Sequence, residues 1–463
     1  MTTKPVALTI AGSDSGGGAG VQADLKTMEA LDVFGTSAVT SLTAQNTTGV
    51  RAVEDADPET VAAQIDAVCE DFDVGAAKTG MLSDAAIVEA VADRVAAHEL
   101  DLVVDPVMVA QSGDRLLDED AESTLRDELV PLARLVTPNV PEAAILSGLD
   151  VHDEATMETA ARKIASEGAE AALVTGGHAA EDAGGERGGT DGADDGTVVD
   201  VLYDAAISTY QKERVGSRDT HGSGCTLSAA IAAELARGDD LKRAVGTAEE
   251  LLHRAVVYGY EMGEGAGSVN HTAGLHDRAA RRDALDGVRR VVGALEDRGE
   301  AAATLIPEVG TNVAVATPYA LDQDEVAAVE GRVHRTVDGV AATRGPRAGA
   351  SGHVARYLLA VREVDRSVRA ACNLRNAPRV RDVVEDTMDT ASFDRTEEPD
   401  DAPGTMEYSV EAAMRGRDDD GYPTAVVDPG AHGKEPMIRL TAESPSALVD
   451  RVTSLIDALG TAR

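Results

Sequence analysis

The sequence predicts an α/β protein of two domains, a larger one with a mainly parallel, helix-flanked sheet and then a second, smaller α/β domain. From residue 5 to about 260, short apolar runs alternate with amphipathic helical patterns, as in βαβ units. A glycine-rich stretch at 263–274 then precedes a new helical pattern at 277–295. The chain of 463 residues also exceeds the roughly 100–200 residues of one typical domain. We therefore expect domains at 1–273 and 276–463, joined by a link that carries few contacts.

The elements of the first domain follow from its apolar periodicity. Strands are predicted at residues 6–10, 38–42, 76–79, 102–104, 135–137 and 172–175. Helices are predicted at residues 22–31, 58–71, 83–97, 141–146, 157–168, 226–236 and 241–259. Residues 179–197 are rich in Gly and Asp, which predicts a mobile surface loop between two strands. In the second domain we expect exposed acidic loops at 395–404 and 415–422 and a closing amphipathic helix at 445–459.

The charge balance excludes several classes of partner. The chain carries 82 acidic and 42 basic residues, a net charge of -40 spread over both halves, which indicates a surface adapted as in halophilic proteins. Such a charge repels nucleic acid and anionic membranes. No apolar run reaches the roughly 18 residues of a membrane span, and no basic leader precedes residues 6–10. The three cysteines lie too far apart for a disulfide framework. We expect a cytoplasmic protein that acts on small molecules.

Two glycine-rich loops join a strand or turn to a helix. The first follows residues 6–10 and allows a ligand to approach the backbone closely, although it lacks the ending of a Walker A motif. Gly18, Gly20 and Ala23 match a dinucleotide-binding spacing, but no acidic residue closes the following strand, so this match is weak. A tight turn with no ligand explains this loop equally well.

The second loop, DTHGSGCT at 219–226, opens an alanine-rich helix and favours an anion at the helix N-terminus. Cys225 lies at the mouth of this helix, where we expect a lowered thiol pKa and a role as general base for a hydroxyl. The alternative is a small buried cysteine that only helps the turn to pack.

Six segments resemble those of the hydroxymethylpyrimidine/phosphomethylpyrimidine kinases, and they occur in the same order. They are GSDSGGGAGVQADLKT (12–27), TAQNT (43–47), KTGML (78–82), DPVM (105–108), TPNVPEA (137–143) and DTHGSGCT (219–226). The resemblance implies a ribokinase-like fold and two successive ATP-dependent phosphorylations of a hydroxymethylpyrimidine, with Mg²⁺. One departure is Thr175, which stands where the family commonly has a lysine near the nucleotide.

The same resemblance assigns the site residues of the first domain. The pyrimidine pocket would be lined by Asp24, Gln45, Met81 and Val107, because an amide pairs with ring nitrogens and apolar side chains enclose a ring. The remaining assignments are the anion hole and ATP phosphates for Gly222, Gly224 and Asn139, the base for Cys225, and magnesium for Glu142. For Glu142, an acid in the first turn of a helix is an alternative without any metal.

The second domain places basic and polar residues beside small ones, which suits a phosphate or pyrophosphate pocket. They are Arg332, His353, Arg356, Asn373, Arg375, Lys434 and Arg439. Pairing with local acids on a solvated surface is the alternative for each.

The segments that contain these residues resemble the archaeal thiamine-phosphate synthase domain. They lie at 307–312, 331–335, 349–356, 373–376, 393–399 and 433–439. The resemblance implies coupling of the pyrimidine diphosphate with thiazole phosphate, with release of pyrophosphate. It makes Arg332 and His353 the essential residues, and we expect Arg375, Lys434 and Arg439 to bind phosphate.

Two rival functions remain. One is a pyridoxal-type kinase with a ligand-sensing second domain, against which Gln45 and Met81 favour a pyrimidine. The other is a thiamine-phosphate sensor with a degenerate kinase, against which the intact Cys225 loop argues. A homodimer is expected because both families are commonly oligomeric.

Overall fold

The computed structural model describes residues 4–108, 117, 119–177, 196–215, 221–399, 404–417, 421–431 and 433–461. The chain divides into two compact units, Met1–Leu275 and His276–Arg463. Most of the loop predicted at 179–197 lies outside the described residues, as do Asp219 and Thr220 of the second glycine loop. No helix in the described ranges has the length and apolar character that crossing a membrane requires.

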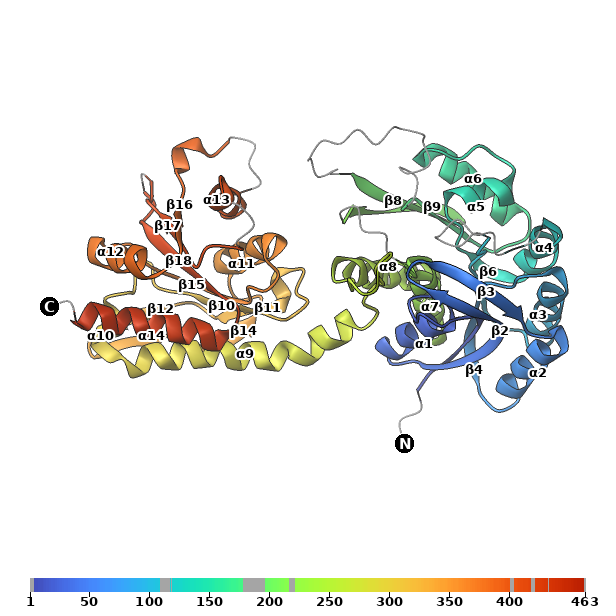
Figure 1. Ribbon diagram of the computed structural model, residues 1–463, viewed down its shortest axis with the longest axis horizontal. Coiled ribbons are helices and arrows are strands. Elements are labelled where there is room, and N and C mark those ends of the chain that lie inside the picture. The colour runs from blue at the N-terminus through green and yellow to red at the C-terminus, as the bar shows by residue number, and fades with distance from the viewer. Residues whose placement is uncertain are drawn as a thin grey trace. The chain divides into compact units, whose positions relative to one another are not determined.

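The first unit is built on a nine-stranded sheet with the order β3-β2-β1-β4-β5-β6-β7-β8-β9 (Figure 1). Its strands are β1 (Val6–Asp14), β2 (Phe34–Asn46), β3 (Gly49–Asp55), β4 (Val74–Thr79), β5 (Leu102–Val104), β6 (Ala133–Val136), β7 (Ala172–Thr175), β8 (Thr197–Asp204) and β9 (Ala206–Glu213). The neighbours from β2 to β7 pair in parallel, whereas β3, β8 and β9 pair antiparallel at the edges. This confirms the predicted mainly parallel sheet.

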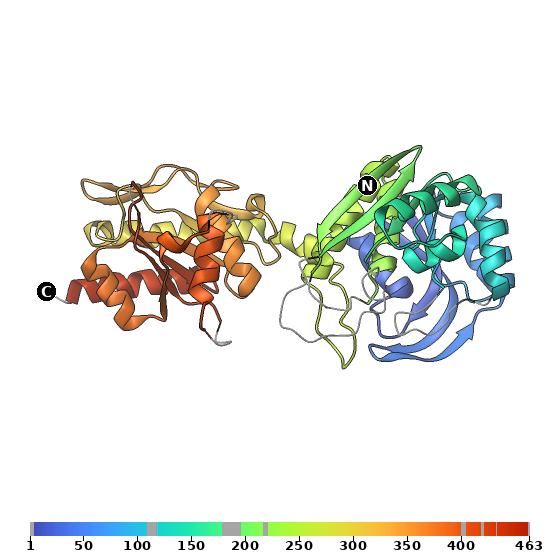
Figure 2. The same ribbon diagram turned by 90° about the horizontal axis from the view of Figure 1, so that it is seen from above.

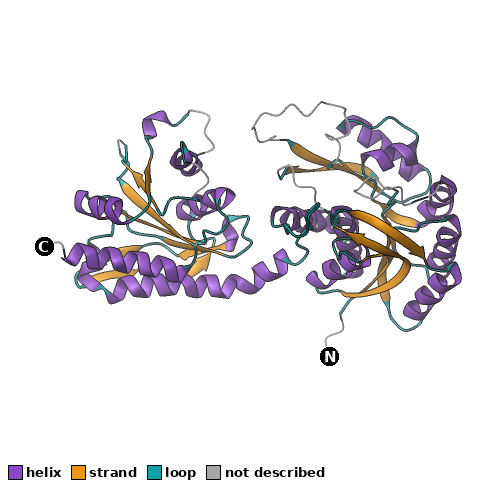
Figure 3. Ribbon diagram, in the orientation of Figure 1, coloured by secondary structure: helices purple, strands orange, loops and turns teal. Residues whose placement is uncertain are grey.

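Helices cover both faces of this sheet (Figure 3). One face carries α1 (Gly20–Ala30), α7 (Ser223–Ala236) and α8 (Leu241–Val257). The other carries α2 (Pro58–Cys69), α3 (Ala85–Ala97), α4 (Glu119–Thr124), α5 (Val140–Ser147) and α6 (Glu154–Ser166). Successive strand residues face opposite sides, so Ala7 packs under α1 and α7 while Leu8 packs under the other layer. The loops that follow β1, β4 and β5 therefore gather at one edge, where ligands of such sheets bind.

The second unit has a seven-stranded sheet with the order β14-β11-β10-β15-β18-β17-β16. Its strands are β10 (Val313–Ala316), β11 (Val326–Val329), β14 (Pro346–Ala348), β15 (Ala370–Arg375), β16 (Thr390–Ser392), β17 (Ala425–Asp428) and β18 (Met437–Ala442), and β12 (Val333–Thr336) and β13 (Gly339–Ala342) form a separate hairpin. All neighbours in the large sheet pair antiparallel except β16 and β17.

Two helical layers also enclose the sheet of the second unit (Figure 2). One layer holds α9 (Ala273–Asp297), α10 (Gly299–Ala303), α12 (Pro378–Thr387) and α14 (Pro445–Thr461). The other holds α11 (Gly352–Val364) and α13 (Thr405–Met414). The helices predicted at 277–295 and 445–459 correspond to α9 and α14.

The glycine-rich stretch at 263–274 is not the loose link that we predicted. A Cβ added at Gly265 would lie 1.8 Å from the Thr47 carbonyl oxygen, and one at Gly267 would lie 2.3 Å from that of Tyr260. Asn270 and His271 are buried. These glycines therefore allow close packing of the backbone within the first unit. Any side chain at Gly265 or Gly267 would collide with the backbone of Thr47 or Tyr260.

The two loops predicted to be exposed in the second unit also contain buried residues. Arg395 pairs with Asp428, and its side chain is only 10% exposed. Tyr422 is buried, and its hydroxyl lies 3.1 Å from that of Tyr357. The polar residues next to Arg395 and Tyr422 in the sequence predicted that both would be exposed. In the fold, Asp428 and Tyr357, which are distant in sequence, cover them.

Candidate active sites

The first glycine loop of the kinase-like unit closes around a carboxylate of its own chain. Asp14 ends β1, and its side chain accepts hydrogen bonds from the backbone N–H groups of Gly16, Gly18 and Ala19 at 2.7, 2.9 and 2.8 Å. Burial opposes ionisation of Asp14, but hydrogen bonds from His221 and this backbone outweigh it and lower its pKa to about 2. The amides that we expected to face a ligand thus hold Asp14.

His221 joins the two glycine loops. Its Nε2 lies 3.2 Å from Asp14 Oδ2 and 3.3 Å from Gln45 Nε2. Gly222 has a φ of +87°, and a Cβ there would lie 1.9 Å from the Gly18 carbonyl oxygen. A glycine is therefore required at position 222 so that the two loops can contact each other. This requirement is separate from the predicted role of Gly222 in an anion hole. Asp14 and His221 are site residues that sequence reasoning missed, although both lie inside its two glycine motifs.

Of the predicted pyrimidine-pocket residues, Gln45 and Met81 lie around the end of β1. A Cβ added at Gly12 would lie 3.4 Å from Met81 Sδ, and one at Gly16 would lie 3.4 Å from the Gln45 carbonyl oxygen. Both side chains are half-buried, as is Val107 after β5. The three residues come from the ends of β2, β4 and β5.

Asp24 does not line a pocket in this structure, which corrects our prediction. Its side chain is completely buried on α1, where its carboxylate lies 3.1 and 3.2 Å from Lys78 Nζ. The Thr9 hydroxyl also donates to it at 2.6 Å. Both oxygens are thus used beneath the site, and none of the carboxylate is accessible to a substrate.

Cys225 is the third residue of α7, and the backbone N–H groups of this first turn have no partner inside the helix. The expected low thiol pKa is wrong for this structure. Burial raises the pKa of Cys225 to about 12, Asp24 and Asp105 add to the rise, and Lys78 opposes it. The helix terminus and Lys78 favour a thiolate, but burial of the thiol, with smaller contributions from Asp24 and Asp105, outweighs them.

Asn139 and Glu142 form a capping box at the start of α5. Asn139 Oδ1 accepts from the Glu142 N–H at 2.9 Å, and Glu142 Oε2 accepts from the Asn139 N–H at 3.0 Å. Glu142 Oε1 also accepts from the Met108 N–H at 3.3 Å. Burial and the nearby Asp105 raise the pKa of Glu142 to about 8. The structural alternative that we stated for Glu142 is therefore present, and no cluster of three metal-ligating side chains occurs among the described residues.

In the second unit, three arginines surround His353 at the first turn of α11. Arg356 Nη2 lies 3.4 Å from His353 Nδ1, and the Arg332 guanidinium donates to the Gly310 carbonyl oxygen at 3.4 Å. Partial burial, Arg356, Arg332 and Arg439, in that order, lower the pKa of His353. His353 is therefore neutral near pH 7, which suits hydrogen bonding to a phosphate better than protonating it.

Arg439 lies on β18 and is not a solvated surface residue. Its guanidinium donates to Asp428 Oδ2 at 2.9 Å and lies 5.2 Å from the centre of the Tyr357 ring. Asp428 is buried and also pairs with Arg395. Within the described part of the chain, Arg439 Nη1 is buried and has no hydrogen-bond partner.

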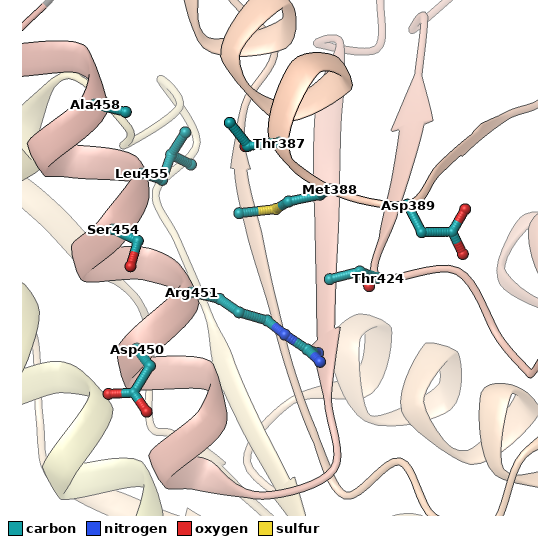
Figure 4. A pocket seen from close by; sticks show the side chains of 9 residues that line it. All are labelled: Thr387, Met388, Asp389, Thr424, Asp450, Arg451, Ser454, Leu455 and Ala458. Carbon is teal, nitrogen blue, oxygen red and sulfur yellow. The ribbon is translucent and has the colours of Figure 1, made fainter.

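Arg375 and Lys434 are exposed and line a hollow of about 610 Å³ together with Asn376 and Glu435. Glu435 accepts the backbone N–H groups of Glu308 and Val309 at 2.8 and 3.2 Å, which fixes one wall. A second hollow, of about 390 Å³, lies between the end of α12, β17 and α14 (Figure 4). None of the predicted synthase residues lines it.

Comparison with known proteins identifies both units. The family model of phosphomethylpyrimidine kinase matches residues 14–270. The chain belongs to the phosphomethylpyrimidine kinase family. Residues 287–454 match the family model described as thiamine-phosphate synthase ThiN. A phosphomethylpyrimidine kinase domain is thus followed by a thiamine-phosphate synthase domain, as the two resemblances predicted.

Two curated relatives each match 58% of this chain. A hydroxymethylpyrimidine/phosphomethylpyrimidine kinase of Rhizobium meliloti is 50% identical over 270 residues, which are 58% of this chain and 96% of the relative. The thiamine biosynthesis bifunctional protein ThiED of Geobacter sulfurreducens is 44% identical over 272 residues, 58% of this chain, and the match spans only 53% of that relative. That relative's other activity is therefore not inferred from the match.

Solved structures also resemble the kinase unit. An ADP complex of Bacillus subtilis pyridoxal kinase is 36% identical with a TM-score of 0.51, covering 58% of this chain and 98% of that one. Staphylococcus aureus pyridoxal kinase in complex with AMP-PCP and pyridoxal is 32% identical with a TM-score of 0.51, covering 58% and 94%. These neighbours confirm the predicted ribokinase-like architecture.

Proposed function

We propose that the first unit phosphorylates a hydroxymethylpyrimidine to its monophosphate and then to its diphosphate, with ATP as donor. The observation that carries this proposal is the position of Cys225 at the N-terminus of α7, beside the contact between the two glycine loops. Gln45 and Met81 lie across these loops, at the end of β1. A substrate held there presents its hydroxyl to Cys225 and its ring to Gln45 and Met81.

The transfer forms a bond between the substrate oxygen and the γ-phosphorus of ATP and breaks the bond to the bridging oxygen, so that ADP leaves. Cys225 accepts the proton of the attacking hydroxyl as a thiolate, so this step requires Lys78 and the positive end of α7 to offset the burial that raises the pKa of the thiol. The backbone N–H groups of Gly224 and Cys225, at the positive end of α7, stabilise the negative charge of the transferring phosphoryl group. In the second step the same groups act on the monophosphate.

ATP is supported by the ADP and AMP-PCP complexes of the neighbouring kinases. We assign magnesium to Glu142, which lies at the start of α5 with Asn139 as its cap. The raised pKa of Glu142 is consistent with a carboxyl group that lacks a neighbouring cation in this structure. Mg²⁺ needs few protein ligands when phosphate groups supply the others. When bound, the ion neutralises phosphate charge.

A pyridoxal kinase is the second candidate, because the neighbouring solved structures act on or bind that vitamin. Steady-state phosphorylation of both substrates by the same preparation separates the two functions. We expect kcat/KM for hydroxymethylpyrimidine to exceed that for pyridoxal by about 10²-fold or more, since hydrogen bonds from a site discriminate strongly. A preference for pyridoxal would transfer the proposal to the second candidate.

We further propose that the second unit joins the pyrimidine diphosphate to thiazole phosphate. The thiazole ring nitrogen forms a bond with the methylene carbon, the bond from that carbon to oxygen breaks, and pyrophosphate departs with the electron pair. Negative charge grows on the leaving oxygen, and Arg332 and neutral His353 donate hydrogen bonds to it. Arg375 and Lys434 hold phosphate groups at the hollow that they line. A homodimer in the cytoplasm remains part of this proposal.

A further inference from the structure

A charged cluster that includes Lys78 lies buried beneath the kinase site. Lys78 on β4 has no solvent exposure, and its Nζ lies 3.1 Å from Asp24 and 4.0 Å from Asp105 Oδ2. Burial lowers the pKa of the Lys78 ammonium, but the attraction of Asp24, Cys225 and Asp105 outweighs this and raises it. Lys78 therefore keeps its charge inside the core.

The cluster is connected to the first turn of α7. The Ser228 hydroxyl donates to Asp105 Oδ2 at 3.0 Å, and it lies 3.0 Å from the Gly224 carbonyl oxygen. A Cβ added at Gly224 would lie 3.9 Å from the same Asp105 oxygen. Asp105 thus lies directly below the residue that precedes Cys225.

Lys78 is fixed from every side. Thr9 pairs with it across β1 and β4 and donates to the same Asp24 carboxylate. A Cβ added at Gly80 would lie 3.2 Å from Lys78 Nζ and 3.0 Å from the Ala11 Cβ, so the space next to the ammonium is tight. The two carboxylates hold the buried ammonium in one position. Because neither water nor salt screens its charge there, its interaction with neighbouring charges is strong.

We propose that Lys78 is a positioning residue of the kinase site, whose buried charge holds Asp24 and Asp105 beneath the first turn of α7, where Cys225 lies. This inference rests on the proposed role of Cys225 as base. The groups that face the thiol are Asp24 from α1, Lys78 from β4, Asp105 after β5 and the N–H of Gly20, and Glu142 acts on Asp105. Lys78 is the one side chain among them that favours the thiolate.

Two single variants separate this role from a structural one. Lys78→Met removes the cation and leaves both carboxylates, so the Cys225 pKa rises and less thiolate exists at any given pH. Asp24→Asn removes a carboxylate and leaves the cation beside Asp105, so the pKa falls. A charge a few ångströms away shifts a pKa by about 1–3 units. If the Lys78–Asp24 pair had only a structural role, both variants would change the reactivity of Cys225 in the same direction.

The measurement is the iodoacetamide reaction rate of Cys225 in the full chain without substrates, resolved by peptide mass spectrometry between pH 7 and 10. At pH 8 we expect Lys78→Met to slow the reaction about tenfold or more and Asp24→Asn to accelerate it about tenfold. Lys163→Met removes an exposed lysine from α6 and serves as the charge control, with an unchanged rate expected. Cys372, buried in the second unit, reports unfolding there by its own labelling, and circular dichroism reports folding of the whole chain.

Equal rates in the wild type and both variants, or changes of the same sign in folded proteins, would overturn the inference. If Lys78→Met does not fold, Asp24→Asn alone decides, because only the electrostatic role predicts faster labelling. The limb of the pH profile on which kcat rises with pH, as the base loses its proton, should follow the same order. Labelling without substrates also keeps this test apart from the proposed function, which fails if the enzyme turns over without Cys225.

Discussion

Cys225→Ala should lower pyrimidine phosphorylation by about 10²–10⁴-fold, the usual cost of removing a general base. The loss should appear in kcat for the first phosphorylation, because the monophosphate of the second step has a pKa of about 6 and carries no proton for a base to remove. The fold should persist, since Cys225 is only half-buried and lies in the first turn of α7. Purified variant and wild type are compared by ATP-coupled assay and by thermal melting.

Cys69→Ala provides the matched control, because this cysteine is also half-buried in the same unit but ends α2, away from the glycine loops. Its turnover should equal that of the wild type. Unchanged turnover of folded Cys225→Ala would exclude the thiol as base and leave the cysteine with the packing role that we named as its alternative.

Removing His353 or Arg332 should nearly abolish the joining step and leave ATP-dependent phosphorylation intact. We expect a loss of about 10²–10³-fold for each, the typical effect of deleting one donor to a developing negative charge. Supplying preformed pyrimidine diphosphate with thiazole phosphate isolates this step, and Cys225→Ala should leave it unchanged. Mutations at distant sites without shared partners act independently.

Arg344→Ala is the control for Arg332→Ala, because Arg344 is exposed and pairs only at the surface with Glu330. It should leave both activities unchanged. If His353→Ala in a folded protein depressed phosphorylation and joining equally, the two activities would share residues, and the assignment of one reaction to each unit would fail.

Local patterns predicted the elements that bury an apolar face. The strands β1, β4, β5, β6 and β7 and all seven predicted helices of the first unit are present within a few residues. The sequence did not predict β3, whose residues are mostly exposed, or the antiparallel strands β8 and β9, of which β9 forms the edge of the sheet. Edge strands form by pairing with a neighbour, and that pairing leaves little trace in their own composition.

The parts of the site that lie within one sequence motif could be predicted. The parts that depend on charged residues from distant positions in the chain could not. The two glycine loops and the turn around Cys225 follow from local sequence. The raised thiol pKa does not, because it results from burial of Cys225 in the folded protein and from Asp24 and Asp105, which come from other parts of the chain. Arg439 likewise resembles a surface cation in sequence, and only the folded sheet places Asp428 beside it.

The most direct test of the two-enzyme account is a single incubation of the full chain with ATP, Mg²⁺, hydroxymethylpyrimidine and thiazole phosphate. The account predicts that thiamine phosphate and pyrophosphate form together, with two ATP molecules consumed for each thiamine phosphate, as chromatography of the mixture would measure. Sustained ATP consumption with accumulation of pyrimidine diphosphate, but no thiamine phosphate, would contradict it and leave the second unit as a binding domain.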